Sequence, residues 1–251
     1  MVTAFAPGKC ILFGEHAVVY GQPAVAISID AGVEVTISES DRWILEGMPF
    51  EPSRHPHISH IINDIFQYKG SPLKIDIKSG LFSAAGLGSS AALSNSMGAA
   101  LHQFTKPNEP LDLISLAKMG HSAEANAQKG RASPTDTATS ALGGCIVVSG
   151  HKVRGTRHVF DATLETPEGS RSWSVCEAKL PEIEDIWIVL GSTGIGSPTG
   201  KMVEGVSELI GKYPQKMDDI RAIGDITSSG LASLSAGDME GVGSAMSSCH
   251  E

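Results

Sequence analysis

The residues best suited to chemistry lie in a glycine- and serine-rich stretch that runs from Gly80 to Leu93. Gly86 and Gly88 bracket Leu87, and a run of small residues follows. Such a backbone can bend around an anion and continue into a helix, whose first amides have no partners and lie at the positive end of its dipole. The stretch is therefore interpreted as a phosphate-binding loop. The alternative, a glycine-rich turn before a small-residue core helix, is equally compatible with the glycines alone.

Five titratable side chains outside this loop are further candidates for a site. Glu15 and His16 fall between two apolar runs, where polar side chains would lie at the lip of a sheet. Lys9 by itself would be a solvated lysine, and Glu124 by itself a solvated helix carboxylate. Asp136 precedes an apolar run and by itself predicts an ordinary aspartate in a loop.

The elements that must position these residues begin with strands. The first 21 residues contain short apolar runs bounded by glycines, which predicts strands broken by tight loops. Residues 24–29 and 33–38 are rich in β-formers, and residues 43–45 give a further candidate strand. Residues 73–77 alternate apolar and polar side chains, which predicts a half-buried strand leading into the phosphate loop.

Helices are expected on both sides of the loop. Apolar residues recur at helical spacing over 89–105, which predicts a core helix whose N-terminus faces the phosphates. A second helix is expected over 111–129, and a hairpin over 158–165 and 172–178. The histidines of 55–60 resemble a metal cluster, but they lack carboxylate or cysteine partners and are interpreted as the start of a helix.

Composition excludes several classes of protein. A chain of 251 residues with 41% hydrophobic residues can bury a core and form one large or two modest domains. Its net charge of -9 argues against nucleic acid or an anionic membrane as a partner. Four scattered cysteines indicate reduced thiols, and neither a leader nor a bilayer-spanning run is visible, so a cytoplasmic protein is expected.

Three ordered motifs then point to a family. They resemble motifs of the GHMP small-molecule kinases. The first, over residues 7–21, contains Pro-Gly-Lys and Glu-His-Ala-Val-Val-Tyr-Gly; the second is Gly-Leu-Gly-Ser-Ser-Ala-Ala over 86–92, and the third is Ser-Pro-Thr-Asp-Thr over 133–137. The first is similar to the mevalonate kinases among them. The resemblance implies an α+β fold of two domains: an N-terminal mixed α/β sheet domain that binds ATP and a ferredoxin-like α/β C-terminal domain.

The resemblance also implies roles for the candidate residues. The activity would be ATP-dependent phosphorylation of the primary hydroxyl of mevalonate, with ATP and Mg²⁺ required. Asp136 and Lys9 would be catalytic, and Ser90 and Glu124 would hold the metal. Glu15 and His16 would shape the mevalonate pocket. The ATP phosphates would be bound by Ala84, Ala85, Gly86, Leu87, Gly88, Ser89, Ser90 and Ala91.

The predicted domains are 1–184 and 185–251, since composition shifts over residues 179–185. Residues 186–190 predict a buried strand of the second domain, and helices are expected after residue 201. The family's third motif, a glycine-rich segment, lies beyond the place that the last residues resemble. We therefore expect a truncated second domain with an exposed sheet edge and exposed apolar helix faces. A homodimer is one candidate for the oligomeric state.

Two rival functions stay open at this point. A related kinase acting on phosphomevalonate or on a sugar would keep Lys9, Glu124 and Asp136 but would be expected to change Glu15 and His16. A catalytically silent member would bind nucleotide or a protein partner. Retention of both Lys9 and Asp136 argues against the silent member.

Overall fold

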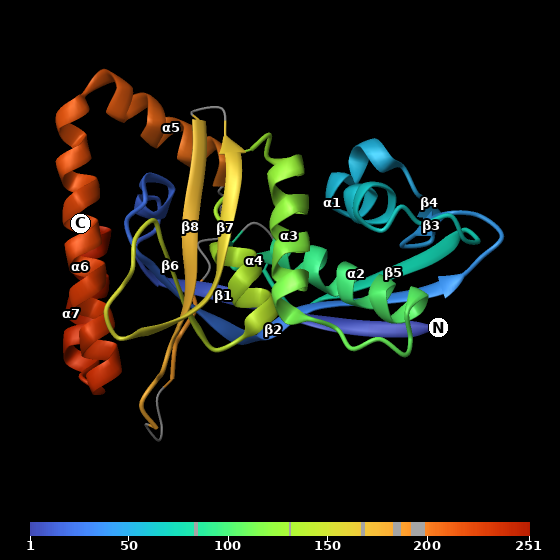
Figure 1. The fold of residues 1–251 in the computed structure, drawn as a ribbon, viewed down its shortest axis with the longest axis horizontal. Helices are drawn as coiled ribbons and strands as arrows, with labels where there is room; N and C mark the ends of the chain where they lie inside the picture. Colours follow the sequence, from blue (N-terminus) through green and yellow to red (C-terminus); the bar gives the residue numbers. More distant parts are fainter. Residues whose placement is uncertain (83–84, 131, 167–168, 183–186, 192–198) are drawn as a thin grey trace.

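A single mixed sheet organises the chain in the computed structural model, which describes residues 1–82, 85–130, 132–166, 169–182, 187–191 and 199–251 (Figure 1). Eight strands pair in the order β4-β3-β5-β2-β6-β8-β7, and β1 pairs with β2 outside that path. All pairs are antiparallel except β3 with β5. The strands are β1 Val2–Phe13, β2 Ala24–Glu39, β3 Ile44–Leu45, β4 Met48–Pro49, β5 Leu73–Ser79, β6 Cys145–Ser149, β7 Thr156–Thr166 and β8 Gly169–Ala178.

Strand β2 is the centre of the sheet. The two runs predicted over 24–29 and 33–38 join into one strand, which pairs with β1 along one edge. Along its other edge, β2 pairs first with β6 and then with β5. Strand β2 therefore joins the part of the sheet that contains β6, β8 and β7 to the part that contains β5, β3 and β4.

The helices confirm most of the predicted pattern. The helix predicted over 89–105 is α2, and the one predicted over 111–129 is α3, where the Asp112 side chain accepts hydrogen bonds from the amides of Ile114 and Ser115. The histidine-rich segment begins a helix, as expected. The helices are α1 Pro56–His60, α2 Ser89–Thr105, α3 Leu113–Ala127, α4 Thr135–Leu142, α5 Thr199–Lys212, α6 Met217–Ala236 and α7 Met239–His250; shorter turns are η1 Ala17–Tyr20, η2 Pro52–Arg54, η3 Ile61–Ile65 and η4 Pro214–Lys216.

The core lies on both faces of the sheet. Ile146 and Val148 of β6 pack in one cluster with Ala117 of α3 and Ala138 of α4. Val147 points to the opposite face, where it joins a cluster with residues of α6 and α7. Alternate side chains of a strand point to opposite faces, so β6 is covered on both sides and all its residues are buried.

Helices α6 and α7 therefore pack directly on the sheet that carries the predicted site. Leu231, Leu234 and Val242 share a buried cluster with Phe13 of β1. Figure 1 shows the pair beside the sheet, with α5 leading into it. The division into domains 1–184 and 185–251 stays a prediction. No helix in the described ranges combines the length and apolar character that a bilayer-spanning segment needs.

Three sequence predictions require correction. The run Val18–Tyr20 forms the 3₁₀ turn η1 and not a strand, because Gly14 and Gly21 adopt positive φ and close a tight loop around it. Residues 133–137 are not a plain loop, since α4 begins at Thr135. Residues 187–190 form no strand and pair with no described strand; Trp187 is 86% exposed and Val189 is 90% exposed. Ile186 lies outside the described residues.

Candidate functional site

The glycine-rich stretch forms a loop at the N-terminus of α2, as the sequence predicts. Gly88 is the N-cap residue with φ of 69°, and no side chain caps the helix. The amides of the first turn are therefore available to a ligand, at the positive end of the dipole. The amide of Lys9 donates to the carbonyl of Leu87 at 3.0 Å, which ties the loop to β1. Ala84 lies outside the described residues.

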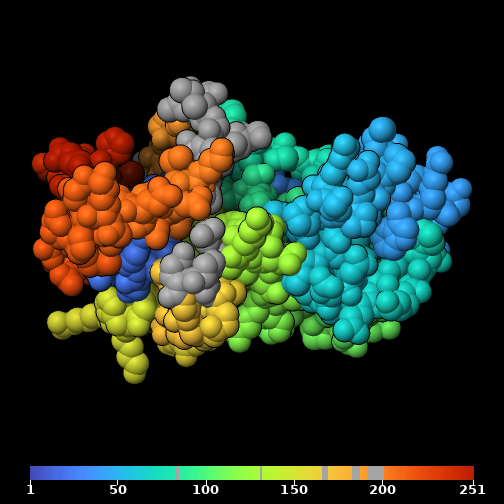
Figure 2. All heavy atoms as spheres, turned by 90° about the horizontal axis from the view of Figure 1, so that it is seen from above, coloured from blue at the N-terminus to red at the C-terminus, as the bar shows by residue number. Residues whose placement is uncertain are grey.

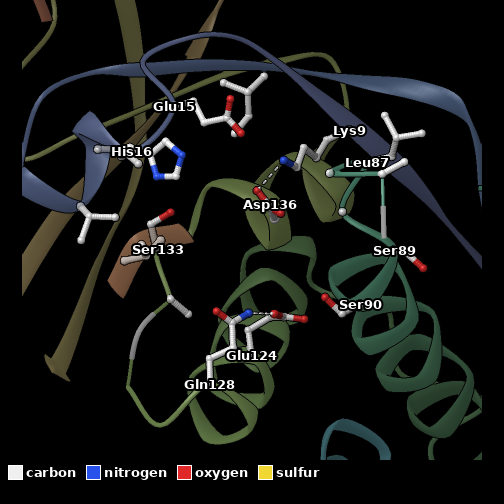
Figure 3. Close-up of a pocket in the computed structure, with 18 residues that line it drawn as sticks. Lys9, Glu15, His16, Leu87, Ser89, Ser90, Glu124, Gln128, Ser133 and Asp136 are labelled. Carbon is white, nitrogen blue, oxygen red and sulfur yellow. Dashed lines mark hydrogen bonds and ion pairs between the residues drawn. The ribbon is translucent and has the colours of Figure 1, made fainter. Parts of the chain in front are cut away.

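Lys9 and Asp136 form an ion pair between β1 and α4. Lys9 Nζ lies 3.1 Å from Asp136 Oδ1, and the Lys9 side chain is almost fully buried. The backbone at Gly88 passes directly over this pair, and a Cβ there would lie 2.9 Å from Lys9 Cγ. The close approach needs glycine, and it brings the loop next to the two charges (Figure 3).

The environment of Asp136 favours its neutral form. Desolvation raises the pKa of the Asp136 carboxyl above its ordinary value, and the charges of Glu124 and Glu15 act in the same direction. Lys9 opposes this shift by attraction and by hydrogen bonding. The carboxyl is thus a stronger proton acceptor than an ordinary aspartate, while the cation beside it favours the ionised form.

Glu124 lies on α3 below the loop, with a carboxylate that is buried and only partly paired. Gln128, one turn further along α3, donates to Glu124 Oε2. His57 Nε2 approaches Glu124 Oε1 to 3.3 Å, but neither atom has a hydrogen-bond partner. Burial raises the pKa of Glu124, but the neighbouring His57, Ser90 and Gln128 outweigh it, and the pKa lies below its usual value. Glu124 is therefore an anion.

These groups fit a magnesium ion. Glu124 Oε1 is a buried anionic oxygen without a hydrogen bond, and the Ser90 side chain at the start of α2 points toward Glu124 (Figure 3). The described residues contain no group of three or more histidine, cysteine, aspartate or glutamate side chains that could enclose a metal. Magnesium commonly uses one or two carboxylates together with substrate phosphates and water, so one carboxylate and one hydroxyl are adequate.

Glu15 and His16 face the same cavity from the segment between β1 and η1. The cavity has a volume of about 350 Å³ and is lined by Lys9, Glu15, His16, Ser90, Glu124 and Asp136, among others. His16 has φ of 62°, an uncommon value for a residue that is not glycine. The described candidate residues thus line one cavity, although they come from four separate segments; the exception is Ala91, which is fully buried in α2 and does not line it.

The sequence did not indicate three residues of this site. Gln128 and His57 contact Glu124, and Ser133 lines the cavity beside His16 (Figure 3). Gln128 could have been found from its i,i+4 spacing to Glu124 on one helix face. His57 lies 67 positions away on another element, and the histidine-rich segment that contains it was interpreted only as the start of a helix.

Comparison with protein families gives a match to the GHMP kinases N terminal domain over residues 57–144. The mevalonate kinase of Methanothermobacter thermautotrophicus is 30% identical, over 97% of this chain and 74% of the relative. The mevalonate kinase of Archaeoglobus fulgidus is 33% identical, over 72% of this chain and 64% of the relative. The chain thus spans about three quarters of the first relative and less than two thirds of the second.

Solved structures share the fold at lower identity. The mevalonate kinase of Methanococcus jannaschii superposes with a TM-score of 0.66 at 22% identity, covering 99% of this chain and 77% of that chain. An L. major mevalonate kinase in complex with R-mevalonate gives a TM-score of 0.69 at 20% identity, covering 100% and 74%. At these identities the likeness concerns the fold.

Proposed function

The chain belongs to the mevalonate kinases of the GHMP kinase family, and from that premise we propose that the cavity between β1, η1, α2, α3 and α4 is where it transfers the terminal phosphoryl group of ATP to the primary hydroxyl of mevalonate. The observation that carries the proposal is the ion pair of the buried Lys9 with the half-buried Asp136, 3.1 Å apart beside the phosphate loop. A base and a cation side by side suit an alcohol that must lose a proton while its oxygen becomes negative.

Asp136 accepts the proton in this mechanism. The hydroxyl oxygen of mevalonate attacks the γ-phosphorus, the bond from that phosphorus to the β–γ bridging oxygen breaks, and ADP leaves. The hydroxyl proton passes to the Asp136 carboxylate. Lys9 keeps that carboxylate ionised before the step and stabilises the negative charge that develops on the attacking oxygen.

The loop from Ala85 to Ala91 binds the phosphates of ATP. Its support is the uncapped N-terminus of α2, where free amides and the helix dipole favour a polyanion. The protein carries a net charge of -9, so binding of a nucleotide depends on such local groups. Lys9, fixed to the loop through its own amide, holds the acceptor oxygen close to the γ-phosphate.

Ser90 and Glu124 hold the magnesium ion. Support comes from the Oε1 atom of Glu124, which is buried and has no hydrogen-bond partner, and from the lowered pKa of this carboxyl. When bound, the ion would neutralise charge on the transferring phosphates and orient them. Gln128 and His57 position the carboxylate from two sides.

Glu15 and His16 orient mevalonate at the opposite side of the cavity. The substrate carries a carboxylate and a second hydroxyl, which require polar partners in the pocket. His16 points into the cavity toward Ser133 and Asp136, and Glu15 lies above Lys9 (Figure 3). With the other polar groups of mevalonate bound there, we place the primary hydroxyl next to Asp136.

A substrate panel tests the proposed function. Purified protein is supplied with ATP, magnesium and one alcohol from mevalonate, phosphomevalonate and galactose, and the release of ADP is followed. We expect turnover with mevalonate that is lost in Lys9→Met. Turnover with another alcohol only, or ATP binding without any turnover, would contradict the proposal and favour a different GHMP kinase or a silent member.

A further inference from the structure

The hairpin of β7 and β8 contributes no described residue to the lining of the cavity. Its outer strand, β7, lies at the end of the strand order, and β8 pairs with β6. Trp173 lies in β8, is 2% exposed, and packs in the cluster that contains Val18 of η1. The hairpin is therefore joined to the segment that carries Glu15 and His16, although more than 150 positions separate them.

Two side chains of β8 donate hydrogen bonds to consecutive carbonyls of η1. The indole Nε1 of Trp173 donates to the carbonyl of Val18 at 2.9 Å. Arg171, two residues earlier on the same face of the strand, donates from Nη1 to the carbonyl of Val19. The Arg171 guanidinium also lies 5.5 Å from the centre of the Tyr20 ring. The end of η1 is thus held from outside by three contacts.

The segment before η1 needs such support. His16 precedes η1 with a φ of 62° and ψ of -41°, and no side chain caps the turn. A residue that is not glycine persists in a sparsely populated conformation only when its surroundings fix it. A single 3₁₀ turn supplies few bonds of its own, since such turns are short and poorly bonded. The contacts from β8 hold the turn η1, which follows directly on His16.

Trp173 also reaches the other wall of the cavity. Its ring meets the ring of His121 edge to face at 6.1 Å. His121, on α3, pairs through Nε2 with the carbonyl of Ala132 at 3.0 Å, and the next residue, Ser133, lines the cavity. One buried indole thus touches the supports of both polar segments that would face the substrate.

We propose that Trp173 and Arg171 are positioning residues, which hold the Glu15–His16 segment in the geometry that binds the acceptor alcohol. This inference rests on the proposed function of that segment. It predicts an effect on affinity for mevalonate, because the described hydrogen bonds and ring contacts of both side chains go to η1 and His121, and not to the phosphate loop or the Lys9–Asp136 pair. The hairpin thereby acquires a role in substrate binding at a distance from the chemistry.

Two variants separate this role from general packing. Trp173→Phe keeps an aromatic ring in the core but removes the Nε1 donor, and Arg171→Met keeps the aliphatic length but removes the guanidinium. The matched control is Ser172→Ala, between them on the opposite, exposed face, where Ser172 contacts only Thr163 of β7 in the described hydrogen bonds. We expect Trp173→Phe and Arg171→Met each to raise the KM for mevalonate about three- to tenfold. In both variants, kcat and the KM for ATP should stay within about twofold of the wild-type values.

Hydrogen exchange of residues 14–22 gives a readout that does not depend on the substrate. Exchange in this segment should be faster in Trp173→Phe and Arg171→Met than in wild type, and unchanged in Ser172→Ala. An active wild type whose two variants keep both the KM for mevalonate and the exchange rates would overturn the positioning role alone. If the wild type shows no mevalonate-dependent turnover, the proposed function is wrong. In that case the positioning role is still tested by hydrogen exchange, and equal exchange rates in the wild type and both variants would contradict it. Should Trp173→Phe fail to fold, Arg171→Met, at a half-buried position, carries the same test.

Discussion

Asp136 determines how the rate should depend on pH. Burial raises its pKa, and the carboxyl acts as a base only when ionised, so the rate should fall as pH drops through that raised value. We expect the acid limb of kcat/KM to lie above the ordinary range of an aspartate. Asp136→Asn should lower kcat by at least about a hundredfold and remove this limb, while ATP still binds.

The measurement is a pH–rate profile of both proteins, with calorimetric titration of ATP. The neighbouring acid Glu15, which also faces the cavity, is a useful comparison because Glu15→Gln removes a charge near Asp136 without removing the base. That variant should shift the acid limb to lower pH. Near-normal turnover in Asp136→Asn would show that another group takes the proton.

Glu124 should govern the requirement for magnesium. Glu124→Gln replaces an anionic oxygen that magnesium prefers, so the magnesium concentration at half-maximal rate should rise about tenfold or more. The control is Glu109→Gln, which removes an exposed carboxylate paired with Lys106 far from the cavity. A magnesium titration of the ADP release rate reports the difference. An equal response of wild type and Glu124→Gln would reduce Glu124 to a helix carboxylate.

At the level of elements, the junction of the phosphate loop with α2 is the most constrained point. Gly88→Ala would force a residue other than glycine to φ of 69° and place Cβ 2.9 Å from Lys9 Cγ. Displacement of Lys9 should lower kcat at least about tenfold, and the backbone strain should lower the free energy of unfolding by roughly 1–3 kcal/mol.

Gly47→Ala is the matched control for the strain. It imposes a similar φ of 74° on the turn between β3 and β4, with nothing within 4 Å of the new Cβ. Both variants should lose comparable stability in urea unfolding, but Gly88→Ala alone should lose activity. Comparable activity in the two variants would mean that Lys9 tolerates the intrusion.

Local pattern determined the elements that could be predicted, and tertiary contacts determined the rest. Helix α2 was predicted to the residue, because a strong period of buried small and apolar residues follows a glycine break. The turn η1 was not, because Val18–Tyr20 has the composition of a strand, whereas positive φ at the flanking glycines and contacts from β8 hold it as a turn. Helix α4 is too short, at eight residues, for its period to stand out before the chain enters β6.

The same distinction applies to the site. Lys9 and Asp136 lie within two of the sequence motifs, and Glu124 was assigned from the resemblance to the family. His57 and Trp173 act through contacts across 67 and 155 positions, which leave no trace in any window of the chain. Sequence reasoning therefore found the groups for chemistry, and it missed the groups that support them.

On the scale of the whole molecule, several large apolar side chains shortly before α5 and within it are exposed to solvent. Trp187, Ile188 and Val189 are all exposed, as are Met202 and Leu209 of α5. In the space-filling view the orange surface of α5 and α6 runs along one end of the molecule (Figure 2). Exposed apolar side chains this close in sequence favour association.

We therefore expect the protein to self-associate with rising concentration, and less so after Trp187→Ser combined with Val189→Ser. Sedimentation velocity over a concentration series measures this. The control is Met48→Ser, a change of another exposed apolar residue, at the start of β4. Equal association of the control and the double variant would indicate a different contact surface.

The burial of Trp173 also gives the molecule an optical reporter. The chain has three tryptophans, of which Trp173 is enclosed, Trp43 is half-buried and Trp187 is almost fully in water. In Trp187→Phe, the remaining fluorescence would come from the buried Trp173 and the half-buried Trp43, which acrylamide quenches less than an exposed indole. The Trp173 ring lies against an imidazole and donates to η1, so its wavelength and lifetime depend on the geometry of that turn. A change in tryptophan fluorescence as mevalonate is titrated into this variant would therefore report a change in the Glu15–His16 segment without an added label.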